Sequence, residues 1–231
     1  MRKLIIVVIT CLLIITYCIP IKACKIDNSE KIILIDPGHG GIDGGAKSKS
    51  GTIEKDINLQ ISLKLRDNLK EKGYKVYMTR ECDEGLYQKG TTVREKKRED
   101  LNKRVEMKKE TECDIFISIH QNMFPQSKCY GAQVWYASND NSYNLATIVQ
   151  QTIKDSVKDN NKRVAKPAAE AYLILRDKYE GASILVECGF LSNPAEETKL
   201  KSDEHQNLIV DGISNGIDKY LNENTQNNLQ S

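Results

Sequence analysis

The residues Ile35-Asp36-Pro37-Gly38-His39-Gly40-Gly41 are the most informative stretch of the sequence, because a buried strand ends there and a histidine follows. The aliphatic run 32–35 favours a strand that is buried on both faces. Glycines on both sides of His39 let the backbone turn tightly while the imidazole projects. In open α/β sheets, ligands bind at the carboxyl ends of strands. The stretch therefore predicts a strand end that presents His39 to a cleft.

Short apolar runs alternate with amphipathic helices along the rest of the chain. We expect further strands and helices as follows: strands at 74–78, 114–119, 132–136, 172–175 and 183–186, and helices at 56–73, 100–112, 141–157 and 208–221. Residues 81–98 hold no core pattern, which predicts a long loop. Strands that alternate with helices indicate an α/β fold, here a single domain whose sheet is covered by helices on both faces.

The N-terminus has the composition of an export segment. Arg2 and Lys3 precede the apolar run 4–18, as in a signal peptide. Cleavage after Ala23, an uncleaved membrane anchor and lipid attachment at Cys24 all remain open. The domain boundaries follow in order: an export segment or anchor at 1–24, one folded domain at 31–221 and a disordered polar tail at 222–231.

Charge and cysteine usage exclude several classes of protein. Without residues 1–23 the chain has 31 basic and 32 acidic residues, which gives no reason to expect nucleic acid as a partner. The charged run 94–109 is typical of a solvated helix face. Four of the seven cysteines lie beyond residue 24, without CxxC spacing, so we expect no structural zinc cluster and at most one disulfide. Among these four, Cys113 and Cys188 adjoin apolar strands and are expected to be small buried residues.

Polar residues that a purely structural sheet would not need lie at three further places. His120 follows one apolar run, Glu187 follows another, and Glu54 opens the first helix. Two histidines and one glutamate suffice for a catalytic zinc site that leaves a position for water, and a second carboxylate is then free to act as a base. Each residue alone has a structural explanation, but only three histidines exist and two of them coincide with the two unusual carboxylates. The third, His205, is expected at the surface.

Two competing sites are weaker. The stretch 41–48 resembles a phosphate-binding P-loop, but Ala46 stands where the motif needs glycine, and Gly51 rather than a long helix follows Ser48. A nucleophilic cysteine normally lies at a helix N-terminus near a histidine, whereas Cys188 ends an apolar strand.

The chain resembles the zinc-dependent N-acetylmuramoyl-L-alanine amidases of the Amidase_3 type over about residues 31–221. The resemblance lies in five separated stretches that occur in the right order: residues 35–41, Glu54, 78–80, 118–122 and 186–193. It implies that His39, Glu54 and His120 bind zinc and that Glu187 is the catalytic carboxylate. It also implies a twisted, mostly parallel sheet of about six strands flanked by helices. The reaction it implies is cleavage between the lactyl group of N-acetylmuramic acid and L-alanine.

A small amidase with an export segment and no wall-binding repeat is similar to the CwlD-type branch, which acts on spore cortex in the muramic-δ-lactam pathway. The expected partners are glycan strands and stem peptides of peptidoglycan, a protein partner for localisation or activation, and the membrane if the N-terminus is uncleaved. The expected location is extracytoplasmic, secreted or membrane-tethered, in the intermembrane space of the developing spore. Two alternatives stay open: a zinc peptidase that cuts within the stem peptide, and a non-catalytic wall-binding module.

Overall fold

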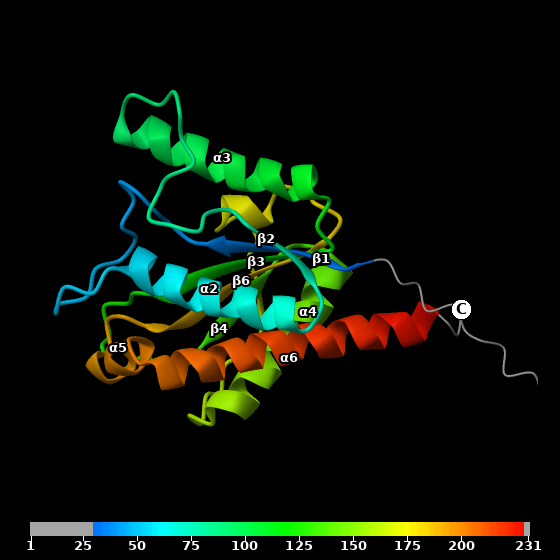
Figure 1. The fold of residues 1–231 in the computed structure, drawn as a ribbon. Coiled ribbons are helices and arrows are strands. Elements are labelled where there is room, and N and C mark those ends of the chain that lie inside the picture. The colour runs from blue at the N-terminus through cyan, green and yellow to red at the C-terminus, as the bar shows by residue number, and fades with distance from the viewer. Residues whose placement is uncertain (1–29, 229–231) are drawn as a thin grey trace, which may run out of the picture.

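One six-stranded sheet organises the chain, and the computed structural model describes residues 30–228 of it. The strands are β1 (Ile32–Pro37), β2 (Lys75–Met78), β3 (Ile115–Asn122), β4 (Gln133–Tyr136), β5 (Lys166–Pro167) and β6 (Ala182–Phe190). The helices are α2 (Glu54–Glu71), α3 (Val93–Thr111), α4 (Asp140–Val157), the 3-10 helix η1 (Leu173–Leu175), α5 (Pro194–Leu200) and α6 (Asp203–Asn228). Figure 1 shows the helices on both faces of the sheet, so the predicted α/β class is confirmed.

The strand order is β2-β1-β3-β6-β4-β5. The first four strands of this order are parallel, and β4 runs antiparallel to β6. The mostly parallel sheet of six strands is therefore confirmed. Because β1, β3 and β6 are adjacent and parallel, their carboxyl ends meet at one edge of the sheet. That edge is where parallel sheets bind ligands.

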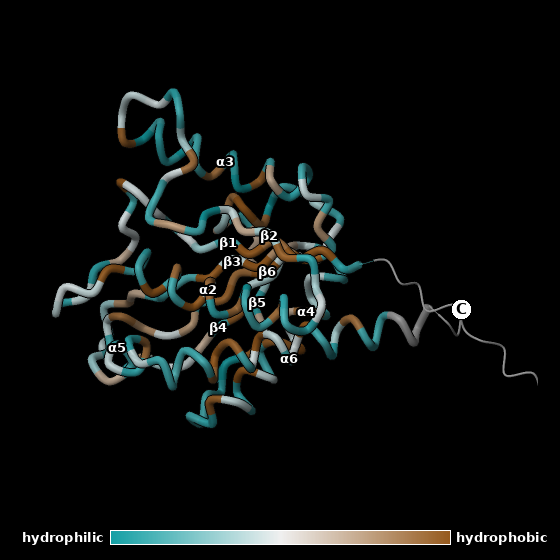
Figure 2. Tube along the Cα trace, in the orientation of Figure 1, coloured by the Kyte–Doolittle hydropathy of each residue, from teal (hydrophilic) through white to brown (hydrophobic). Residues whose placement is uncertain are grey.

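The two faces of the sheet are covered in different ways. Helices α2, α4 and α6 pack on one face over a large apolar cluster that includes Ile33, Ile117 and Ile213. Helix α3 and η1 cover the other face, above the sheet in Figure 1, over a smaller cluster that includes Leu34 and Phe116. In Figure 2 the central strands β1, β3 and β6 are brown, whereas α3 is mostly teal. We call these the apolar face and the α3 face.

Helix α3 is attached to the sheet by buried charges. Its buried residues are Arg104 and Lys108, one turn apart and thus on one side of the helix. Arg104 forms ion pairs with Asp36 and Asp100, and Lys108 Nζ lies 3.0 Å from Asp177 Oδ1. Our expectation of a fully solvated helix face is therefore wrong on this side. A buried cation is tolerated only where carboxylates and carbonyls surround it, and apart from Asp100 these partners lie far away in the sequence.

Helix α3 also begins earlier than predicted, inside the expected loop 81–98. Thr92 caps it: the Thr92 side chain accepts a hydrogen bond from the Glu95 backbone N–H, and the Glu95 carboxylate accepts one from the Thr92 N–H. This capping box satisfies two N–H groups that lack helical partners. The loop therefore ends at Thr92, and residues 93–98 are helical.

Three other expectations need correction. The segment 172–175 was predicted as a strand, but residues 173–175 form η1, and the sixth strand of the sheet is instead the two-residue β5. Helix α5 was not predicted, although Asn193 caps it and Pro194 opens it. Helix α6 continues to Asn228, where a tail from residue 222 was expected, because residues 222–228 contain neither proline nor glycine to end it.

His205 is buried on the first turns of α6, not at the surface as predicted. Burial lowers its pKa below the ordinary value. Cys113 and Cys188 are buried as expected, and the four cysteines of the described segment are free. The predicted export segment 1–24 lies outside the described residues, and within 30–228 no helix has the length and apolarity that a bilayer crossing requires.

Candidate metal centre

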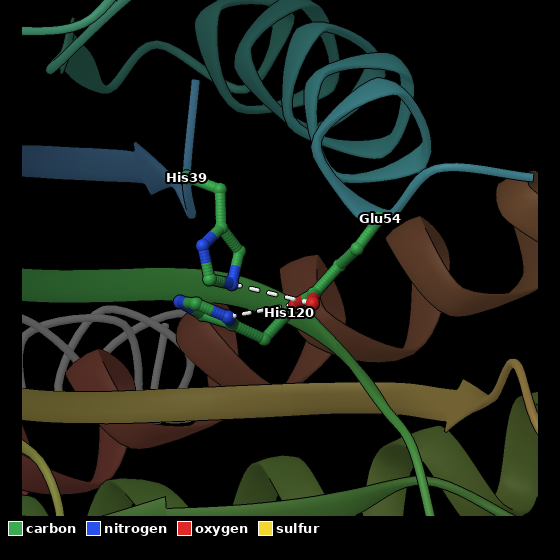
Figure 3. A group of neighbouring side chains, drawn as sticks. All are labelled: His39, Glu54 and His120. Atoms are coloured by element: carbon green, nitrogen blue, oxygen red, sulfur yellow. Dashed lines mark hydrogen bonds and ion pairs between the residues drawn. The ribbon is translucent and has the colours of Figure 1, made fainter. Parts of the chain in front are cut away.

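Three of the predicted site residues converge at the carboxyl edge of the sheet. His39 follows β1, Glu54 is the first residue of α2, and His120 lies near the end of β3 (Figure 3). One donor atom from each of the three lies within 4.8 Å of the other two. The Glu54 carboxylate joins them, with Oε2 at 3.2 Å from His39 Nε2 and Oε1 at 2.9 Å from His120 Nδ1. The rings of His39 and His120 meet edge to face at 4.9 Å between centroids.

His39 adopts a backbone conformation that is uncommon for a residue with a side chain. Its φ of 63° lies in the left-handed region, where a non-glycine residue costs on the order of 1–3 kcal/mol. A turn in which Gly40 and Asp43 exchange backbone hydrogen bonds follows directly. Asp43 also lies beside the imidazole, with Oδ2 at 3.0 Å from His39 Nδ1. The ring is thus held at Nδ1, and Nε2 faces Glu54.

Glu54 is fixed by backbone hydrogen bonds, and His120 is placed by the space beside a glycine. Glu54 accepts N–H groups of Ala46 at 2.7 Å and Gln121 at 3.0 Å. Gly38 lies flat against the imidazole of His120, since a Cβ there would lie 2.2 Å from Nε2. The glycine of the sequence motif therefore gives the second histidine its space.

The three residues form a strongly coupled set of charges. Burial disfavours the imidazolium of His39, but hydrogen bonds to Asp43 and Glu54 outweigh burial and raise its pKa to about 9. Burial likewise disfavours the charged form of Glu54, yet hydrogen bonds with His120 and His39 hold its pKa well below the usual range. A carboxylate between two imidazoles therefore stays ionised, as a metal ligand must.

The donor set fits a zinc ion. Tetrahedral zinc binds imidazole nitrogen and carboxylate oxygen at about 2.0–2.2 Å, which places neighbouring donors roughly 3.3 Å apart. The separations of 2.9 and 3.2 Å, from the two histidine nitrogens to the two Glu54 oxygens, are close to that value. Two nitrogens and one carboxylate oxygen also leave a fourth position for water or substrate.

Glu187 lies beside this group on β6, where its Cα pairs in register with that of His120. Burial raises the pKa of Glu187 to about 7, despite the opposing charge of His120. The hydroxyl of Tyr172, the residue before η1, lies 3.4 Å from Oε1. Oε2 is buried and has no hydrogen-bond partner among the described residues. This second carboxylate is thus close to the histidines and free to exchange a proton at neutral pH.

A cleft of about 420 Å³ opens over all four residues. It extends beneath α3, where Leu101, Leu173 and Leu185 line it. Tyr172 lines it as well, with its ring tilted against Trp135 at 5.8 Å between centroids. The site is therefore concave and lined by both polar groups and apolar side chains.

The sequence predicted His39, Glu54, His120 and Glu187 as site residues, and all four line one cleft. Asp43 and Tyr172 also line it but were not predicted. Asp43 lies four residues after His39, a spacing that a turn of glycines could have suggested. Tyr172 carried no signal, because its segment was assigned to a strand.

Comparison with known proteins gives one consistent result. The family model described as N-acetylmuramoyl-L-alanine amidase matches residues 33–219. The germination-specific N-acetylmuramoyl-L-alanine amidase of Bacillus subtilis is 39% identical over 204 residues, 87% of this chain and 84% of that protein.

Solved structures agree with that result. The CwlD amidase from Clostridioides difficile, solved in complex with the GerS lipoprotein, has 42% sequence identity and a TM-score of 0.80, covering 84% of this chain and 99% of that one. An N-acetylmuramoyl-L-alanine amidase from Clostridium difficile 630 has 32% identity and a TM-score of 0.73, covering 84% and 97%.

Proposed function

Because the chain belongs to the N-acetylmuramoyl-L-alanine amidase family, we propose that it uses zinc to hydrolyse the amide between the lactyl group of N-acetylmuramic acid and L-alanine in peptidoglycan. The convergence of His39, Glu54 and His120 within 4.8 Å carries this proposal. A zinc ion bound there would polarise the scissile carbonyl and lower the pKa of water from about 15.7 towards 7.

Glu187 is the residue that moves the proton. Its carboxylate takes a proton from the attacking water and returns it to the leaving amine of L-alanine. The pKa of about 7 suits both steps, because the carboxyl is then partly ionised at neutral pH. Glu187 lines the cleft, and the Tyr172 hydroxyl beside Oε1 orients its carboxylate.

Metal content measured beside turnover separates the roles of these residues. Glu187→Ala leaves three ligands, so we expect zinc to stay bound while turnover falls by about 10² to 10⁴. His39→Ala or His120→Ala leaves two protein ligands, so we expect zinc and activity to be lost together. If Glu187→Ala loses zinc while His120→Ala keeps one equivalent, the roles are reversed and the proposed site is wrong.

Mass spectrometry of the digestion products identifies the bond. Amidase cleavage frees intact stem peptides with N-terminal alanine, whereas a stem-peptide peptidase leaves alanine on the glycan. We expect the first product only when zinc is present, and a chelator should abolish it.

We assign the enzyme to spore peptidoglycan, with stem-peptide removal preceding muramic-δ-lactam formation. The similarity to a germination-specific amidase and to CwlD supports this assignment. Cortex from a strain that lacks the gene should then contain intact stem peptides and no muramic-δ-lactam. Normal cortex would place the enzyme elsewhere in the cell wall.

We further propose that the enzyme works outside the cytoplasm, delivered by residues 1–24 into the intermembrane space of the developing spore, and that a protein partner localises or activates it. The CwlD amidase solved with a lipoprotein supports a partner of that kind. High activity of the purified enzyme alone on intact sacculi would make the partner unnecessary.

A further inference from the structure

We propose that Arg104 of α3 is a positioning residue for the metal ligand His39, which it holds through the backbone. This inference rests on the proposed zinc site. It starts from the carbonyl oxygen of His39, which accepts a hydrogen bond from Arg104 Nη2 at 2.7 Å. The left-handed conformation of His39 points this carbonyl away from the strand, towards α3.

The guanidinium of Arg104 uses all five of its N–H donors. Nη2 donates to the His39 carbonyl and to Asp100 Oδ1, and Nε donates to Asp100 Oδ2 at 2.6 Å. Nη1 donates to Asp36 and to the Pro37 carbonyl, the latter at 3.0 Å. The side chain is only 2% exposed. A planar guanidinium whose donors are all bonded fixes the distances between the acceptor atoms that it joins.

Arg80 binds the same segment and shares the Pro37 carbonyl with Arg104. Its Nε donates to the Pro37 carbonyl at 2.9 Å, and its Nη2 donates to the Gly38 carbonyl at 3.1 Å. Three consecutive carbonyls, from residues 37 to 39, thus end on two buried guanidinium groups. Arg104 alone reaches the carbonyl of the histidine, so it controls the rotation that sets where the imidazole points.

A second contact from α3 reaches the same histidine and is weaker. Lys97 Nζ lies 2.7 Å from Asp43 Oδ1, and Asp43 in turn holds His39 Nδ1. The Lys97 side chain is 47% exposed, and an ion pair in that setting contributes little. We therefore assign the positioning role to Arg104.

The variant Arg104→Lys tests this role, because it keeps a cation beside Asp36 and Asp100. A lysine has three donors on one atom and cannot join both carboxylates and both carbonyls. Removing a residue that holds a metal ligand in place typically lowers metal affinity by about 10–100-fold. We expect zinc affinity, measured by competition with a chromogenic chelator, to fall by that factor.

Lys108→Met is the matched control. Lys108 is also a fully buried cation of α3, one turn further along, but it bonds the Ile174 carbonyl and Asp177 instead of the His39 segment. The control loses a buried cation and should destabilise α3, yet we expect its zinc affinity to stay within about threefold of the parent protein. An equal loss of affinity in both variants would show that loosening of α3, not the contact to His39, is responsible, and would overturn the proposal.

The histidine side-chain NMR signals of the metal-free protein give a readout that needs no zinc. The chain has three histidines, and His205 lies away from the cleft as an internal reference. Arg104→Lys should shift or broaden the His39 signals and leave those of His205 unchanged.

The outcomes separate this inference from the proposed function. If the parent protein binds no zinc, the proposed function fails, and the His39 signals still decide the role of Arg104. If the parent binds zinc, and Arg104→Lys binds it equally with unchanged His39 signals, the inference fails alone. Should Arg104→Lys not fold, the pair Asp36→Asn/Arg104→Gln removes both buried charges together, and the same two measurements apply.

Discussion

Different interactions hold the helices against the apolar face and against the α3 face of the sheet. On the apolar face, α6 packs along α4 and α2 through aliphatic side chains such as Ile213 and Ile217. On the α3 face, the apolar cluster is smaller, and the side chains of α3 that are buried are the guanidinium of Arg104 and the ammonium of Lys108. Hydrophobic contacts are non-directional, whereas charged hydrogen bonds fix distances and angles. The face that is held by directional bonds is also the one from which Glu187 and the cleft are reached.

The largest change in stability should come from leaving a buried charge without its partner on the α3 face. Arg104→Met leaves the fully buried carboxylate of Asp36 without its cationic partner. Breaking a buried ion pair in this way destabilises by about 3–5 kcal/mol. Urea unfolding at pH 7 measures the loss. The double variant Asp36→Asn/Arg104→Met should recover part of it, and a single variant within about 1 kcal/mol of the parent would contradict the comparison.

A cavity on the apolar face should cost somewhat less and leave the site intact. Ile213 is fully buried on α6, and replacing a buried isoleucine by alanine costs about 2–5 kcal/mol. We expect Ile213→Ala to unfold at lower urea concentration with zinc affinity unchanged. A fall in zinc affinity would mean that the apolar face also positions the ligands.

The free energy of unfolding should fall as the pH rises, because Glu187 on the α3 face loses its proton. Burial raises its pKa from 4.5 to about 7, so the folded protein retains this proton more tightly than the unfolded chain does. Its contribution is fully present below pH 4.5 and is lost as pH rises through about 7. A shift of that size corresponds to roughly 3 kcal/mol.

Glu187→Gln avoids this loss. The variant should therefore match the parent near pH 4 and be more stable by about 2–3 kcal/mol at pH 8.5 in metal-free protein. Thermal unfolding at the two pH values checks the sign. If the difference in stability between the variant and the parent is the same at both pH values, the titration of Glu187 is not what makes stability depend on pH.

The smallest effect concerns the start of α3. Thr92→Ala removes the cap, which typically costs about 1 kcal/mol. Hydrogen exchange should speed up for the amides of residues 93–96 and stay unchanged in α6. Thr92→Ser keeps the hydroxyl and serves as the control. Faster exchange in α6 as well would show that the two faces unfold as one unit.

The sequence predicted the α/β class and the four residues at the strand and helix ends because those features are local, whereas the mostly parallel sheet followed from the family resemblance. An aliphatic run followed by Pro-Gly-His identifies a strand end without any knowledge of the rest of the chain. The start of α3 was equally local, since Thr92 and Glu95 have capping-box spacing, yet the charged sequence around them hid it. Asn193 followed by Pro194 was a readable helix start of the same kind.

What the sequence could not predict depends on distant partners. Arg104 is buried because Asp36 and the carbonyls of residues 37 and 39 lie beside it, 65–68 positions away in the chain. The aliphatic residues 173–175 suit a strand or a buried turn equally well, and only the space left beneath α3 makes them η1. His205 was misplaced for the same reason, because its polar neighbours in sequence say nothing of the α4 residues Ile153 and Val157, which lie around it.

The direction of β1 separates the start of the described chain from the candidate metal centre. The strand enters the sheet at Ile32 and delivers His39 beyond its other end, and six residues of strand span about 20 Å. A segment that precedes β1 therefore joins the domain at the end of the strand opposite to the cleft. Whatever binds such a segment can hold the enzyme without covering His39, Glu54 or His120.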